Sequence, residues 1–302
     1  FFIFFVVNRH KCYNVVMKRL IWKGVKTLLI LFMGFLLFLT GQTAAEWVKV
    51  QQEIKTFTSK GALREDISTD TIKYYQVSRE TYYPDEFERE PFYNNDLKYP
   101  GAEGDILVTR QSPFANKPGI YGFVTFYFGG HAAYVGEDNT LYETSGIIGP
   151  GSNLFKTLFQ GSDSTIASTS SNYWLNPNFR NDKDPTYNAF GTYYRKEFIG
   201  LRVKGITSDE IKEVNEFMNH VVDIEAQYNF FFVFRTQNRY YCTDLISRGF
   251  DTITYSNGNQ KYNLNSDLVV TTVNDLILSD DTYISFYVRT DKNNVKHIYF
   301  IE

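Results

Sequence analysis

One cysteine in this sequence has the surroundings that nucleophilic chemistry requires. Cys242 opens residues 242–249, which are predicted to form a short helix that ends at Gly249. The free N–H groups and the positive dipole end of a helix stabilise a thiolate at its first position. Cys242 is therefore a candidate nucleophile.

The cysteine count leaves other roles open for this thiol. The chain has two cysteines, and Cys12 lies in a segment that is expected to be removed. A single thiol in an exported chain is buried and inert, paired with another chain, or reactive. Two cysteines are too few for a disulfide-stapled scaffold or a cysteine-based zinc site.

A thiolate nucleophile needs a base, and three histidines lie beyond residue 45. His220 falls on the polar face of a predicted helix, so we expect it in solvent. His297 lies in a predicted terminal strand, where a structural role is favoured. His131 follows Gly129-Gly130 and precedes two alanines, and these small residues allow a close approach. His131 is the candidate base, and a half-buried structural histidine is the alternative.

The register of a predicted hairpin places a carboxylate beside His131. Residues 137–139 are typical of a three-residue loop with Asn139 in the left-handed conformation. In that register Glu143 lies opposite Ala133 and is a diagonal neighbour of His131 on the same face. There it would orient the imidazole and stabilise imidazolium. A two-residue loop would instead make Glu143 an exposed carboxylate on the other face.

The remaining pattern predicts an α+β domain. The expected strands cover residues 106–110, 121–128, 131–135, 140–144, 198–203, 283–289 and 295–301, and the expected helices cover 207–227 and 242–249. A capping box, Thr207-Ser208-Asp209-Glu210, opens the first of these helices. Residues 146–190 are rich in Gly, Ser, Asn, Asp and Pro, and we expect them to form a long connection that covers a substrate.

The N-terminal region predicts export. Met17 is the better start, which makes residues 1–16 an upstream extension. Residues 17–45 contain a basic part, an apolar run over 28–39 and a small-residue cleavage site, the three parts of a signal peptide. An uncleaved membrane anchor is the alternative, although the strongly apolar part is short for a span. We expect a secreted or cell-surface protein that meets a membrane only through an uncleaved signal sequence.

The charge argues against polyanionic partners. The whole chain has a formal net charge of −3, and removal of the six basic residues in positions 1–45 leaves 25 basic against 34 acidic residues, a net charge of −9. DNA, RNA and anionic membrane surfaces are therefore not expected partners. No cofactor is expected, and no metal, because the chain lacks HExxH and Asp182-Lys183-Asp184 lacks calcium-loop spacing.

A set of motifs resembles the NlpC-type papain-like cysteine hydrolases, in the circularly permuted YiiX/YebB-like branch, where the histidine precedes the cysteine. The motifs are, in order, Gly104-Asp105-Ile106-Leu107, Gly130-His131, Glu143, Tyr241-Cys242-Thr243-Asp244-Leu245-Ile246 and the segment 270–276. The resemblance covers about residues 97–290. Thr243-Asp244 departs from the Ser-Glu that the family often has, and Ala132-Ala133 from its bulkier residues.

The resemblance implies a papain-like fold over residues 97–302, with an antiparallel sheet or barrel packed against helices. It implies Cys242 as nucleophile, His131 as general base and Glu143 as the residue that orients the base. The backbone N–H of Cys242, with Tyr241, is the candidate oxyanion site; a packed aromatic is the alternative for Tyr241.

Two further motif residues, Gly104 and Asp105, are expected to fix a turn at the start of a strand. Residues 46–96 have no counterpart in the family and are expected to form an N-terminal arm. Its stretch 84–91, rich in acids and aromatics, is expected at the surface.

The function that the resemblance implies is an exported cysteine amidase or endopeptidase. It would act through an acyl-thioester on a peptide or amide, with cell-wall peptide, that is peptidoglycan, as the favoured substrate. A lipid or amide acyltransferase or esterase on the same fold is one alternative. A non-catalytic exported binding module is the other, and the 23 tyrosines would suit its recognition surface.

Overall fold

The computed structural model describes residues 2–79, 89–111, 120–144, 166–169, 172–176, 195–232, 236–265 and 270–302 of the chain. The chain divides into two compact units, Phe1–Trp47 and Val48–Glu302. Helix α1 (Phe2–Thr58) contains an apolar stretch that begins at Ile21 and is long and apolar enough to cross a membrane. A signal sequence has the same character, so this N-terminal helix is compatible with the expected export.

One large sheet organises the second unit. Its nine strands, within the described residues, run in the order β1-β2-β11-β10-β7-β3-β4-β5-β6. Neighbours pair antiparallel except β2 and β11, which are parallel. The strands are β1 (Gly61–Leu63), β2 (Ile72–Val77), β3 (Ile106–Thr109), β4 (His131–Val135), β5 (Leu141–Thr144), β6 (Ile166–Thr169), β7 (Glu197–Val203), β10 (Thr282–Thr290) and β11 (Lys296–Ile301). A separate parallel pair joins β8 (Gln227–Tyr228) to β9 (Arg239–Tyr240).

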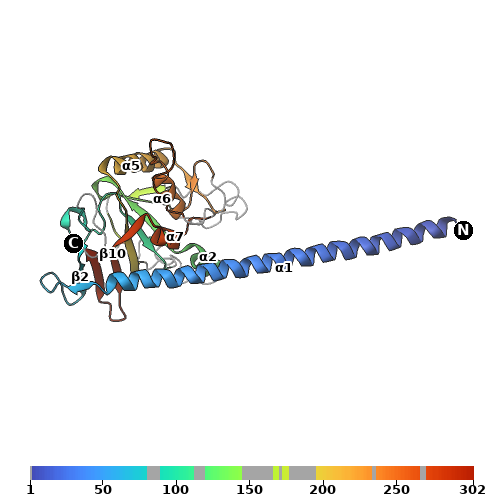
Figure 1. Ribbon diagram of the computed structural model, residues 1–302, viewed down its shortest axis with the longest axis horizontal. Helices are drawn as coiled ribbons and strands as arrows, with labels where there is room; N and C mark the ends of the chain where they lie inside the picture. The colour runs from blue at the N-terminus through green and yellow to red at the C-terminus, as the bar shows by residue number, and fades with distance from the viewer. Residues whose placement is uncertain are drawn as a thin grey trace, which may run out of the picture. The chain divides into compact units, whose positions relative to one another are not determined.

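Among the described residues that follow α1, the helices of this unit are short apart from α5, and Figure 1 shows α5 and α6 side by side. They are α2 (Ile120–Phe128), α5 (Ser208–Asp223), α6 (Cys242–Phe250) and α7 (Val273–Leu278), with 3-10 turns η2 (Tyr93–Asn95) and η3 (Glu137–Asn139). The predicted capping box of α5 is confirmed, because Thr207 and Glu210 exchange their side-chain and backbone hydrogen bonds. His220 is exposed on this helix, as its position predicts.

Each face of the sheet has its own core. Side chains that alternate along the strands, such as Ile106 and Val108, pack with α5, α6 and α7 in what we call the helix-side core. Their neighbour Leu107 faces the opposite side, the aromatic core, which contains Tyr74, Phe92, Tyr173, Trp174, Phe198, Phe286 and Phe300. Part of the high aromatic content of the chain therefore fills this second core.

The α+β prediction is confirmed: a large, mostly antiparallel sheet packs against helices. The strand predicted over residues 121–128 is wrong, because these residues form helix α2. Their continuous apolar run carries no periodicity that separates a strand from a helix. Gly129, with φ of +87°, follows the helix and its N–H bonds the Thr125 carbonyl.

Two helix ends also differ from the predictions. Helix α5 ends at Asp223, before the expected residue 227. Helix α6 continues through Gly249 to Phe250. A Cβ at Gly249 would lie 2.8 Å from Met218 of α5, so this glycine permits close packing of the two helices and does not stop α6.

The segment over residues 46–96 contributes to the folded unit. Val50, Ile54 and Phe57 of α1 are buried in the helix-side core, and β2 lies in the large sheet. Arg89 is buried and bonds Asp105 at 3.3 Å, whereas residues 84–88 of the expected surface stretch lie outside the described residues. Most of the expected substrate-covering connection, residues 146–190, also lies outside them.

Candidate active site

Helix α6 carries Cys242 at its first position. Tyr241 is the N-cap residue in an extended conformation, and its carbonyl accepts the Leu245 N–H at 2.9 Å to start the helix. The Cys242 thiol is free and half-buried, beside the helix-side core. It therefore lies at the positive end of a nine-residue helix, as the sequence predicts.

His131 begins β4, and its side chain lies within hydrogen-bonding reach of Cys242. Its Nε2 lies 2.7 Å from Oε2 of Glu143, which leaves Nδ1 as the nitrogen for the cysteine. The ring is buried and stacks on Trp174, with centroids 6.1 Å apart and planes 14° apart. The structure thus brings together the three residues that the sequence singled out.

Opposing effects set the protonation of His131. Burial lowers its pKa, but the hydrogen bonds to Cys242 and Glu143 and the negative charge of Glu143 raise it. The net result is a pKa above the usual value of 6.5. The site therefore favours imidazolium, the partner that a thiolate at Cys242 requires.

The predicted hairpin register is confirmed, and it explains the position of Glu143. Tyr134 pairs Tyr142 and Val135 pairs Leu141, so Glu143 falls opposite Ala133. The loop has three residues, and Asn139 has φ of +59°. Glu143 consequently shares a face of the sheet with His131.

Two residues that the sequence did not single out also bind Glu143. The hydroxyl of Tyr173 donates to Oε1, and Arg195 Nη2 lies 3.3 Å from Oε2. Arg195 also covers the rings of Trp174 and Tyr173, at 4.1 Å and 4.8 Å from their centroids. The aromatic pair Tyr173-Trp174 inside a polar connection was the available signal, whereas nothing local marks Arg195.

These contacts determine the charge of Glu143. Burial raises its pKa, but the charge of Arg195 and the hydrogen bond with His131 outweigh burial and lower the pKa to about 2. The side chain is therefore a carboxylate at neutral pH. It can orient the imidazole and stabilise its charge.

Tyr241 has a structural contact that bears on its expected role. Its hydroxyl accepts the Thr271 backbone N–H at 2.9 Å, and its ring packs against Phe232 at 5.2 Å. Burial raises the pKa of this tyrosine, so its hydroxyl stays neutral. The Tyr241 oxygen thus has a structural hydrogen bond as an acceptor, while the backbone N–H of Cys242 at the helix start remains the candidate oxyanion donor.

Gly104 and Asp105 form a buried turn before β3. Gly104 has φ of +89°, a conformation that favours glycine. Asp105 accepts from Arg202 at 2.9 Å, from Arg89 at 3.3 Å and from the Ala102 N–H at 2.9 Å. Both residues lie in a structural ion-pair cluster.

The other features of the sequence lie outside this arrangement. His297 is half-buried in β11, where its Nδ1 lies 3.2 Å from the Tyr75 hydroxyl and its ring stacks on Tyr75. Within the described part of the chain, no group of three or more His, Cys, Asp or Glu residues could hold a metal ion. No protein-family model, curated protein or solved structure matches this chain.

Proposed function

We propose that this chain is an exported cysteine hydrolase, an amidase or endopeptidase, with the permuted papain-like fold of the NlpC-type enzymes. The observation that carries the proposal is the hydrogen-bonded series Cys242, His131 and Glu143 at the start of helix α6. A nucleophile, a base and a residue that orients the base are the parts of this chemistry.

The mechanism begins when the Cys242 thiolate attacks a carbonyl carbon and forms a C–S bond. The resulting oxyanion accepts a hydrogen bond from the Cys242 N–H at the helix start. His131 then gives its proton to the leaving nitrogen, and the C–N bond breaks to leave an acyl-thioester. Water attacks that thioester while His131 takes its proton, and the C–S bond breaks to release the carboxylic acid.

Cell-wall peptide is the substrate that we propose. Two features support it: the N-terminal apolar helix, which is compatible with export, and the motif resemblance. A net charge of −9 beyond residue 45 argues against nucleic acid as the substrate.

Digestion of purified cell walls tests this function. We expect the full chain to release new amine termini, detected by mass spectrometry, and Cys242→Ala to lower the rate by about 10³-fold or more. Cys12→Ala is the matched control and should keep the wild-type rate. Release that survives in Cys242→Ala would contradict the proposal.

Acyl transfer on a lipid is a second candidate, and one feature of the surface favours it. Helix α2 leads directly to Gly129-Gly130-His131, and none of its side chains over residues 122–128 is buried. Phe123 is 54% exposed, and Phe128 stacks on Phe232 at 4.6 Å. An apolar surface beside the base suits an acyl chain. Incubation with phosphatidylcholine vesicles, followed by a mass spectrum of Cys242, would detect a long-chain acyl-enzyme only in this case.

A further inference from the structure

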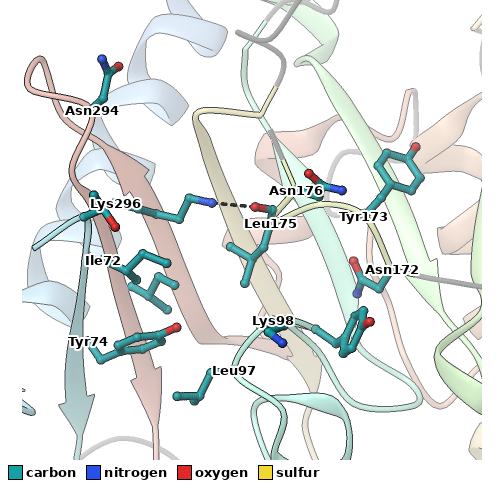
Figure 2. A pocket seen from close by; sticks show the side chains of 13 residues that line it. Ile72, Tyr74, Leu97, Lys98, Asn172, Tyr173, Leu175, Asn176, Asn294 and Lys296 are labelled. Carbon is teal, nitrogen blue, oxygen red and sulfur yellow. Dashed lines mark hydrogen bonds between the residues drawn. The ribbon is translucent and has the colours of Figure 1, made fainter. Parts of the chain in front are cut away.

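A pocket of about 550 Å³ lies over β2 and β11, away from the thiol-bearing helix. Its walls come from Ile72 and Tyr74 of β2, Lys296 of β11, the loop over residues 97–99 and the segment over residues 172–176 (Figure 2). This volume is in the range of small-molecule sites. We call it the lysine pocket, after Lys98 and Lys296.

The charged side chains that line the lysine pocket are positive, although the chain as a whole is acidic. Among the described residues that line it, Lys98 and Lys296 are cationic and none is a carboxylate. Asp96, just outside the lining, accepts the backbone N–H of Lys98 at 3.0 Å. The cationic lining would therefore attract an anion.

Of the two lysines, Lys296 gives the stronger argument for an anion site. Figure 2 shows its ammonium reaching across to the carbonyl of Leu175, at 2.6 Å. The side chain is half-buried, and burial lowers the pKa of its ammonium. An anion that supplies the countercharge would stabilise a partly desolvated ammonium beside a backbone carbonyl.

Apolar and aromatic side chains form much of the remaining lining, beside the polar Thr71, Asn172, Asn176 and Asn294. The apolar and aromatic contributors are Ile72, Tyr74, Leu97, Tyr99, Leu175 and Ile298. Such walls suit an alkyl chain or an aryl ring, which the hydrophobic effect would bury. We infer that the lysine pocket binds an organic carboxylate with an apolar body, its carboxylate on Lys98 and Lys296.

One wall of this pocket also belongs to the candidate active site. Tyr173 lines the pocket, while its hydroxyl donates to Glu143. The next residue, Trp174, stacks on His131. A bound carboxylate would contact the segment that positions Glu143 and His131, so its presence should change the reactivity of Cys242.

Calorimetric titration of the full chain in detergent with 4-phenylbutyrate tests the binding. We expect saturable binding at least about tenfold tighter than that of the neutral 4-phenylbutanamide, and weaker still for the cation 4-phenylbutylamine. Partition into detergent would instead favour the neutral amide. Equal affinities for the three compounds, or no saturable binding of the carboxylate, would overturn the inference.

Variants localise the site. Lys98→Met and Lys296→Met should each weaken 4-phenylbutyrate and leave the amide unchanged. Lys73→Met is the matched control, because Lys73 lies between Ile72 and Tyr74 on β2 and faces the other side of the sheet. Lys98 is exposed, so its variant remains informative if Lys296→Met fails to fold. Equal effects of the Lys98 and Lys73 variants would contradict the site.

A separate measurement tests whether a ligand in the lysine pocket changes the reactivity of Cys242. Saturating 4-phenylbutyrate should change the rate of Cys242 alkylation by iodoacetamide at least about twofold, and an unchanged rate would remove the link. Binding itself is independent of the proposed hydrolase activity, because Cys242→Ala should bind 4-phenylbutyrate as the wild type does. Failure of one proposal is thereby distinguishable from failure of the other.

Discussion

Glu143 interacts with several polar and charged groups of the candidate active site. It accepts from His131 and Tyr173 and faces the charge of Arg195. Its pKa of about 2 lies below the ordinary 4.5, so the native state favours the carboxylate. This group therefore stabilises the fold fully above about pH 4.5, and the contribution is lost as the pH falls toward 2.

Removal of the Tyr173 hydroxyl tests this balance. Tyr173→Phe should raise the pKa of Glu143 and lower the free energy of unfolding at pH 7 by about 1.5–3 kcal/mol, the usual range for a hydrogen bond to a charged group. The loss of stability in acid should still begin near pH 4.5, but it should be smaller and end at a higher pH than in the wild type. NMR titration of Glu143 and urea unfolding from pH 2 to 7 measure both effects.

Tyr287→Phe is the matched control, because Tyr287 donates to Glu197 at 3.1 Å in another part of the sheet. It should change stability without changing the pKa of Glu143. A shift of that pKa as large in the control as in Tyr173→Phe would show that the hydrogen bond to Tyr173 does not set it.

Residue-level prediction from the sequence worked where the interaction was local. Glu143 lies one hairpin from His131, so the loop length sufficed to predict their common face. Arg195 and Tyr173 reach Glu143 from 52 and 30 positions away in the chain. No local periodicity encodes such a contact, because it arises from the packing of separate segments.

At the scale of the secondary-structure elements, the turn between α2 and β4 positions His131. Gly129 has φ of +87°, and Gly130 lies against the chain beyond β3. A Cβ at Gly130 would lie 2.0 Å from the Gln111 carbonyl oxygen. From the sequence, the two glycines predicted a close approach at this point of the chain. The helix before them was not predicted.

Gly130→Ala should displace the start of β4. We expect the free energy of unfolding to fall by about 1–3 kcal/mol through overpacking, and Cys242 alkylation to slow because His131 moves. Gly122→Ala is the matched control, since nothing lies within 4 Å of a Cβ there and alanine favours a helix by about 0.5–1 kcal/mol. If Gly130→Ala retained wild-type stability and alkylation, this turn would not position the base.

At the scale of the whole molecule, the second compact unit, Val48–Glu302, begins within α1. Val50, Ile54 and Phe57 are spaced as one face of a helix and are buried in the helix-side core. Cleavage after residue 45 would leave all three in the mature chain. This spacing is present in the sequence. The sequence does not show the surface against which these side chains pack, because strands and helices far along the chain form it.

Phe57→Ala tests this contribution. The side chain is fully buried, so we expect the free energy of unfolding to fall by about 3–5 kcal/mol in urea titrations. Val48→Ala on the same helix, at a side chain that is 58% exposed, should change it by less than about 0.5 kcal/mol. Similar values for both variants would show that α1 adds no core to this unit.

The central claim is that His131 activates Cys242, and the rate of Cys242 alkylation by iodoacetamide tests it most directly. Peptide mapping counts Cys242 separately from Cys12, and His220→Ala, at an exposed histidine of α5, is the control. We expect Cys242 to react faster than a model thiol near neutral pH, His131→Ala to slow it by about tenfold or more, and His220→Ala to leave it unchanged. A model-thiol rate that His131→Ala does not alter would contradict the account.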